Sequence, residues 1–201
     1  MTIRTPAIAP VIAGTLLLGA LLAASPAAAQ SFTGPRVEAT IGWDQMHFDL
    51  NDVGQAGRAK QSGLDFGGAI GYDQQVGANL IAGVEASATG SDTGYVTGTA
   101  TNGTSLRERR DLSIAARLGT KITPNTLLYG KVGYSNLQTG TTTTIAGVSS
   151  ESHRDLDGVV VGAGLEVAIS PKAYLKTEYD YSNYAAGVTK NDILTGIGLR
   201  F

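Results

Sequence analysis

The sequence predicts an all-β fold: an eight-stranded antiparallel up-and-down transmembrane β-barrel, preceded by a signal peptide. Three observations predict this fold. The chain beyond its first 29 residues alternates apolar and polar residues in eight short segments, the two-residue period of strands with one buried face. Short turns alternate with longer links between these segments. Glycines and charges share one face of the segments, and bulky apolar residues share the other.

The N-terminal residues have the pattern of a secretory signal. Arg4 supplies a positive charge, an apolar stretch runs from Val11 to Ala24, and three alanines at 27–29 provide the small residues that a signal peptidase requires. The apolar stretch of about 14 residues is shorter than the roughly 20 that a spanning helix requires. We therefore expect a signal peptide, residues 1–29, that is cleaved from a barrel domain, residues 30–201.

Composition excludes several classes of function. The chain has 15 Lys and Arg against 17 Asp and Glu, so it lacks the basic excess of a nucleic-acid-binding protein. It has no Cys and only two histidines, His47 and His153, which excludes disulfides and thiolate metal sites and disfavours a histidine-rich one. We expect no cofactor, no metal and no nucleic-acid partner.

Eight alternating segments follow in order. In the first, Val37, Ile41 and Trp43 share the apolar face, and Glu38 and Asp44 share the polar face. The same alternation predicts strands at about 36–48, 62–73, 79–89, 108–120, 126–138, 155–169, 172–184 and 191–201. Three apolar residues fall on the polar face against this pattern, namely Ile81, Val160 and Leu194.

The connections between the segments are of two kinds. Tight turns are predicted at 74–78, 121–125 and 170–172, and their centres at 76, 123 and 171 are 47 and 48 residues apart. That spacing corresponds to one pair of antiparallel strands per unit. Longer links rich in Gly, Thr, Ser and Asn are predicted as loops at 49–61, 90–107, 139–154 and 185–190. Long links at one end and short turns at the other are typical of membrane barrels.

The position of the glycines indicates that the polar face lines the interior. An eight-stranded barrel has an interior just wide enough for side chains, so long charged residues need bare glycines beside them. On a solvent-exposed face, glycine would weaken the strands without this benefit. The glycines that share the face of the charges are Gly42, Gly67, Gly71, Gly83, Gly133, Gly162, Gly164, Gly196 and Gly198.

The charges on the polar face predict an interior network, because buried charges require partners. Its expected members are Glu38, Glu85, Arg117, Lys131, Glu166, Lys176 and Arg200. Around the turn centred at 171, Glu166 and Lys176 lie opposite each other, and in a closed ring Glu38 and Arg200 fall at the same level. Arg117 and Lys131 face each other unfavourably, so we expect Glu85 to pair with Arg117 and Glu166 to pair with Lys131. The alternative is a set of solvated surface charges.

Aromatic residues lie near strand ends on the apolar face, as in the interfacial girdles of a membrane barrel. They are Trp43, Tyr72, Tyr134, Tyr179, Tyr181 and Phe201. Tapering soluble barrels also place aromatics at strand ends, so this feature alone does not choose between a soluble and a membrane barrel.

The segments Gly67–Tyr72 and Gly130–Tyr134 and the ending Leu199-Arg200-Phe201 resemble the OmpA-like outer-membrane β-barrel family, nearest in style to the small surface-antigen or opacity type of Gram-negative bacteria. The resemblance covers the whole predicted barrel domain. It implies insertion into the outer membrane, both termini in the periplasm and long loops outside the cell. It also implies that Phe201 is the signal read by the barrel-assembly machinery.

The same resemblance implies outer-membrane lipids and lipopolysaccharide as partners. Five basic residues of the predicted loops could touch lipopolysaccharide phosphates at the outer rim, although solvated loop charge is the favoured interpretation. They are Arg58, Lys60, Arg107, Arg109 and Arg110. Some family members continue into a peptidoglycan-binding domain. This sequence stops at the last predicted strand, so we expect no cell-wall tether.

Three functions are compatible with such a barrel. The favoured hypothesis is a non-enzymatic outer-membrane protein that contributes to envelope integrity and displays its loops, because interior ion pairs would fill the lumen. The alternative is a narrow porin-like channel for small solutes or ions. A lipid A-modifying enzyme is favoured least, because Ser152 and His153 are adjacent on an extended chain and point to opposite faces. His47 has no obvious Ser and acid at strand spacing.

Overall fold

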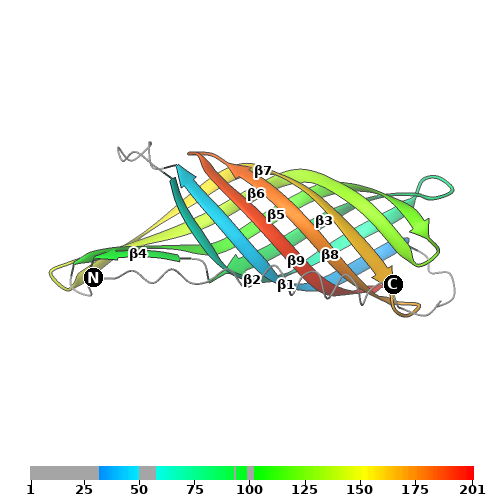
Figure 1. Cartoon of the computed structure of the whole chain (residues 1–201), viewed down its shortest axis with the longest axis horizontal. Coiled ribbons are helices and arrows are strands. Elements are labelled where there is room, and N and C mark those ends of the chain that lie inside the picture. The colour runs from blue at the N-terminus through cyan, green and yellow to red at the C-terminus, as the bar shows by residue number, and fades with distance from the viewer. Residues whose placement is uncertain (1–31, 50–57, 93, 99–101) are drawn as a thin grey trace.

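A computed structural model of the chain describes residues 32–49, 58–92, 94–98 and 102–201 (Figure 1). The predicted signal peptide, residues 1–29, lies outside these residues. Within them, no helix has the length and hydropathy needed to cross a membrane. The described chain is built from the strands β1 (Gly34–Asp49), β2 (Arg58–Gln75), β3 (Leu80–Ser91), β4 (Gly94–Gly98), β5 (Gly103–Thr123), β6 (Thr126–Ile145), β7 (Val148–Ala168), β8 (Ala173–Tyr184) and β9 (Val188–Arg200).

Eight of these strands close into a ring, which confirms the predicted fold class. Sequential neighbours pair antiparallel, β3 pairs with β5, and β1 pairs with β9 to close the barrel. The short β4 stands outside the ring and pairs only with the start of β5. Within the closed ring, each strand pairs on both sides, as a sheet surrounded by lipid requires.

The two ends of the barrel differ. At one end, named the turn end here, short connections at 76–79, 124–125 and 169–172 join the strands. Gly34 and Phe201 also lie there, and the Phe201 amide donates a 2.9 Å hydrogen bond to the Pro35 carbonyl oxygen. The opposite end, named the loop end, carries the connections of β1 to β2, β3 to β5, β6 to β7 and β8 to β9.

The predicted loop at 139–154 is wrong, because β6 and β7 continue through it as a hairpin. Its register runs from Thr139 opposite Arg154 to Ile145 opposite Val148. The Thr-rich composition favours a strand, since β-branched residues fit a pleated sheet. Ala146 and Gly147 close the hairpin with φ angles of 50° and 80°, the positive values of a type I′ turn.

The predicted loop at 90–107 is also partly wrong. It contains β4 and the first residues of β5, which pair from Gly94 opposite Arg107 to Gly98 opposite Gly103. Together β4, β5, β6 and β7 form a four-stranded extension that projects beyond the rest of the barrel, at the left of Figure 1. The predicted loop at 185–190 shrinks to residues 185–187.

The side chains have the inside-out arrangement that the sequence predicts. Leu112, Val161 and Ile197 are 42–51 % exposed on the outer surface, whereas Arg117 and Glu166 are 4 % and 0 % exposed. The six predicted girdle aromatics are 38–70 % exposed. Apolar side chains therefore face outward around the ring, and charged side chains and glycines occupy the lumen.

Candidate functional site in the barrel lumen

All seven predicted network residues lie in the lumen, and each is at most 5 % exposed. They belong to a larger ion-pair system in the half of the barrel nearer the turn end. We call it the turn-end network, and it consists of Arg36, Glu38, Asp73, Glu85, Arg117, Lys131, Glu166, Lys176, Glu178, Asp180 and Arg200.

Three guanidinium groups link the carboxylates of the turn-end network. Arg36 contacts Glu38, and its nitrogens lie 3.1 Å from Asp73 and 2.8 Å from Glu85. Arg200 lies 2.9 Å from the same Asp73 carboxylate. Because Asp73 is shared between arginines of β1 and β9, the seam that closes the barrel is bridged from inside.

Arg117 of β5 extends this linkage across the lumen. Its guanidinium contacts Glu166 of β7 and lies 3.5 Å from both Asp73 and Glu85. It also lies 3.8 Å from the centroid of the Tyr129 ring, in cation–π geometry. One side chain therefore links its own strand to four others, β2, β3, β6 and β7.

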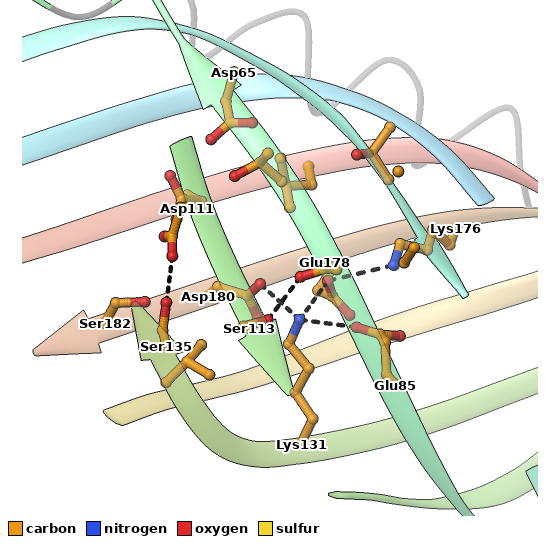
Figure 2. A pocket seen from close by; sticks show the side chains of 18 residues that line it. Asp65, Glu85, Asp111, Ser113, Lys131, Ser135, Lys176, Glu178, Asp180 and Ser182 are labelled. Atoms are coloured by element: carbon orange, nitrogen blue, oxygen red, sulfur yellow. Dashed lines mark hydrogen bonds and ion pairs between the residues drawn. The ribbon is translucent and has the colours of Figure 1, made fainter. Parts of the chain in front are cut away.

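Two lysines complete the network near the middle of the barrel (Figure 2). The Nζ atom of Lys131 lies 3.2 Å from Glu85, 2.9 Å from Glu178 and 2.8 Å from Asp180. The Nζ atom of Lys176 lies 2.5 Å from Glu38 and 3.4 Å from Glu178. Each ammonium group thus bridges carboxylates from different strands.

Part of the predicted pairing is wrong. Lys131 does not pair with Glu166, because the register places Lys131 opposite Gly162 and Glu166 opposite Leu127. Glu166 pairs instead with Arg117 and Arg200.

Glu38 and Arg200 are also not at one level, since Arg36 is opposite Arg200 and Glu38 is opposite Gly198. Arg117 faces Lys131 and Glu166 faces Lys176 as predicted. The Lys176 ammonium nevertheless turns to Glu38 and Glu178.

Three interior tyrosines were not predicted from the sequence. Tyr129, Tyr174 and Tyr184 point into the lumen, opposite Gly164, Gly198 and Gly158 in the neighbouring strands. The hydroxyl groups of Tyr129 and Tyr174 each donate a 2.6 Å hydrogen bond, to Glu178 and Glu38 respectively. Each of these tyrosines shares the alternation phase of the polar face in its strand, which is the signal that could have predicted its inward position.

Gly198→Ala should destabilise the folded barrel by about 1–3 kcal/mol, the range for overpacking a filled core. A Cβ atom at Gly198 would lie 2.2 Å from Cζ of Tyr174. The midpoint of urea unfolding, followed by fluorescence of the single tryptophan, measures the effect. Gly130→Ala is the control, because a Cβ there meets its nearest atom at an ordinary 3.7 Å. Equal midpoints for the two variants would contradict the prediction.

The half of the lumen nearer the loop end holds a second group of charges, called the loop-end acidic cluster here. It contains Lys190 and five carboxylates, namely Asp44, Asp65, Glu108, Asp111 and Asp192. The Nζ atom of Lys190 lies 2.9 Å from both Asp65 and Glu108. These contacts join β9 to β2 and β5 across the lumen.

None of these six residues belongs to the network predicted from the sequence, and for two of them the reason is clear. Lys190 fell in a predicted loop. Glu108 and Asp111 both face inward although strict alternation would separate them. The β-bulge between Glu108 and Arg110 inserts one residue and turns Glu108 into the lumen.

Apolar clusters cover the charges at both ends of the lumen. At the loop end the buried cluster is Met46, Leu137, Leu156, Tyr184 and Val188. At the turn end it is Phe32, Ile81, Leu127 and Tyr129. Gly34, the first residue of β1, has a φ angle of 110°, and Phe32 two residues before it belongs to the turn-end cluster. Ile81, an exception to the sequence alternation, therefore belongs to an interior cap, and Val160 and Leu194 are likewise buried.

The loop-end rim carries exposed charges. Arg109 lies 2.6 Å from Glu151, and Arg110 lies 3.7 Å from Asp155. The His153 ring nitrogen Nε2 lies 3.9 Å from Glu151. The side chain of Arg58 and its surroundings lie outside the described part of the chain. Within that part, no three His, Cys, Asp or Glu side chains are arranged to hold a metal ion.

Comparisons with known proteins agree with this architecture. The family model described as "Outer membrane protein beta-barrel domain" matches residues 14–201. A comparison with curated proteins finds no significant match. Among solved structures, Ail, the attachment invasion locus protein of Yersinia pestis, is similar with a TM-score of 0.55 and 18 % identity, over 85 % of this chain and 100 % of that one.

Neisserial surface protein A, NspA, is similar with a TM-score of 0.54 and 17 % identity, over 84 % of this chain and 98 % of that one. At identities this low, the structural similarity shows the shared fold alone. The family model, in contrast, matches nearly the whole sequence. The chain therefore belongs to the outer membrane protein β-barrel domain family, and it is an outer-membrane β-barrel protein of the same fold as Ail and NspA.

Proposed function

We propose that the protein is a non-enzymatic component of the outer membrane that contributes to envelope integrity and displays its loop end at the cell surface. The closed lumen carries this proposal. Apolar caps cover both ends, ion pairs fill the space between them, and the cavity within measures about 30 Å³. A lumen filled in this way favours a membrane-stabilising role over passage of solutes.

We further propose that the turn end faces the periplasm. The start of β1 and Phe201 lie there, and short turns are typical of the periplasmic side of such barrels. Cleavage at the predicted site after Ala29 would leave Phe32 close to the new N-terminus. The projecting extension of β4 to β7 would then stand outside the cell.

The absence of enzymatic activity is supported by the residues at the rim. Ser152 and His153 are adjacent on β7, so their side chains leave opposite faces of the strand. The acid within 4 Å of His153 is Glu151, two residues away on the same strand. A nucleophile, a base and an orienting acid need to converge on one point, and these three side chains do not.

The proposed partners follow from the surfaces. Outer-membrane lipids would contact the apolar belt, and the barrel-assembly machinery would read Phe201, which is 70 % exposed at the turn end. Lipopolysaccharide phosphates would approach Arg109 and Arg110, which are about half exposed at the rim. Ail has been solved in complex with the heparin analogue sucrose octasulfate. An anionic ligand at the rim arginines is the corresponding proposal for this chain.

Conductance in a planar lipid bilayer tests the proposed function. We expect no resolved single-channel steps from the purified barrel, because ion pairs and apolar caps leave no continuous water path. A porin of known conductance, added to the same bilayer, checks that proteins insert. Sizeable and reproducible steps from the barrel itself would favour the alternative, a narrow channel.

A further inference from the structure

The loop-end acidic cluster is short of positive charge. In the described residues, the lumen buries six Lys and Arg side chains and 11 Asp and Glu side chains. The turn-end network holds five of the cations and six of the carboxylates, so it is close to balance. Apart from Asp44, which accepts a 2.8 Å hydrogen bond from Ser91, the loop-end acidic cluster sets four carboxylates against one described cation, Lys190. Buried carboxylates without compensation are costly, so this half of the lumen needs further positive charge.

Lys190 alone cannot neutralise these carboxylates. Its Nζ atom lies 2.9 Å from Asp65 and from Glu108, 3.5 Å from Asp192 and 3.9 Å from Asp111. An ammonium group carries one charge and three hydrogens. One oxygen each of Asp65, Glu108 and Asp192 is buried without a hydrogen-bond partner. Several carboxylate oxygens in this cluster are therefore unsatisfied.

A cavity lined mostly by polar residues lies beside two of these carboxylates, Asp65 and Asp192. It measures about 30 Å³, and its lining includes Asp65, Asp111, Asp180 and Asp192. Figure 2 shows Asp65, Asp111 and Asp180 around it. Asp192 is 5 % exposed, and its Oδ1 atom accepts no hydrogen bond. A cavity of this size holds about two water molecules, so there is room for a small ion.

We propose that this cavity takes up small monovalent cations from solution, either as a proton on a carboxyl group or as a hydrated alkali-metal ion. Both sources bring positive charge to buried carboxylate oxygens that lack a partner. The described side chains form no cage that would ligate a metal directly. An alkali ion would therefore keep water, and the hydroxyl groups of Ser113 and Ser135 line the same space.

Charged and titratable groups from seven strands face the cavity and the cluster. They are Asp44 of β1, Asp65 of β2, Glu85 of β3, Glu108 and Asp111 of β5, Lys131 of β6, Lys176, Glu178, Asp180 and Tyr184 of β8, and Lys190 and Asp192 of β9. Asp192 is the position to change, because it lines the cavity and its contact with Lys190 is a long one of 3.5 Å.

Thermal unfolding of the folded barrel in detergent tests the proposal. It would be followed by Trp43 fluorescence at constant ionic strength in sodium, potassium or N-methyl-D-glucamine chloride, each at mildly acidic and mildly alkaline pH. We expect the lowest midpoint in N-methyl-D-glucamine at alkaline pH, where neither source can fill the cavity. Each tenfold rise in cation concentration above its dissociation constant should raise the midpoint by about 3–5 °C.

The arms of this experiment separate the two sources. A midpoint that rises with sodium or potassium at fixed pH identifies an alkali ion, and one that rises only with acid identifies protons. Asp192→Asn should lose most of the dependence. Asp155→Asn, at a carboxylate whose side chain is 54 % exposed, should keep all of it. Equal wild-type midpoints in all conditions would overturn the proposal, as would full dependence in Asp192→Asn.

Heat-dependent gel migration shows whether each variant is folded. If Asp192→Asn does not fold, crystals of the unaltered protein soaked in thallium(I) provide a second measurement. Anomalous density in the cavity supports the alkali ion, and an empty cavity with a pH-dependent midpoint supports protons. An empty cavity together with a midpoint insensitive to pH would end the proposal.

Discussion

Arg117→Met is expected to destabilise the folded barrel by about 3–5 kcal/mol, the range for breaking a buried ion pair by removing one partner. Arg117 contacts Glu166 and lies 3.5 Å from Asp73 and Glu85, and none of these groups can turn to solvent. Methionine matches much of the volume of arginine but carries no charge. The loss therefore reports uncompensated carboxylates rather than a cavity.

The free energy of unfolding in urea measures this loss, with Trp43 as the fluorescent reporter because it is the single tryptophan. Arg110→Met is the matched control, since Arg110 is 40 % exposed in its side chain and its contact with Asp155 is 3.7 Å long. Exposed ion pairs contribute about 0–1 kcal/mol. If Arg117→Met cost no more than Arg110→Met, the turn-end network would not stabilise the fold.

Val132→Arg is expected to destabilise the barrel in lipid bilayers by about 2–4 kcal/mol, the cost of an arginine on the lipid face near the membrane centre. Val132 is 55 % exposed on β6, between Leu128 and Tyr134 in the outward row. The charge would have to enter hydrocarbon, because the lumen on the other side of the strand is already filled.

Gln138→Arg provides the control on the same strand. Gln138 also faces outward but lies beyond the girdle residue Tyr134, where its amide donates a 3.0 Å hydrogen bond to Asp155. An arginine there stays near the interface, where the cost is about 0–1 kcal/mol. Unfolding in liposomes and in detergent separates the two effects. A similar small loss for both variants would mean that Val132 does not face lipid.

The fold could be predicted because its main determinant repeats along the whole chain. Alternation of residues such as Val37, Ile41 and Trp43 with Glu38 and Asp44 fixes which side of each strand meets lipid, and a register error of two residues leaves that side unchanged. Short turns such as Pro124-Asn125 then fix the order of the strands. Both features are local, so one sequence suffices to find them.

The details of the site could not be predicted in the same way. Which carboxylate pairs with Lys131 depends on the stagger between strands. The register sets Lys131 opposite Gly162, four residues from Glu166, and its ammonium group reaches Glu178 and Asp180 of β8 instead. The bulge before Arg110 reverses the parity of Glu108, and alternation alone cannot reveal it. Long side chains also reach past their nearest register neighbour, as Lys176 does.

The predicted loops failed for a different reason. Polar residues such as Thr141–Thr144 are common in loops, but threonine also suits a strand, and pairing over a long hairpin decides between the two. The turn at Ala146 and Gly147 holds the left-handed backbone that closes it. Composition alone could not show that the two runs of polar residues face each other in register.

The hairpin of β6 and β7 has a mechanical consequence. A chain of the same length without a hydrogen-bonded ladder would bend freely and sweep a wide volume, whereas paired strands transmit a push on the tip to the wall of the cylinder. The paired strands therefore hold Ala146 and Gly147 at the tip of a stiff hairpin rather than on a flexible loop. Whatever touches that tip meets a surface already fixed in direction, so little freedom of motion is lost on contact.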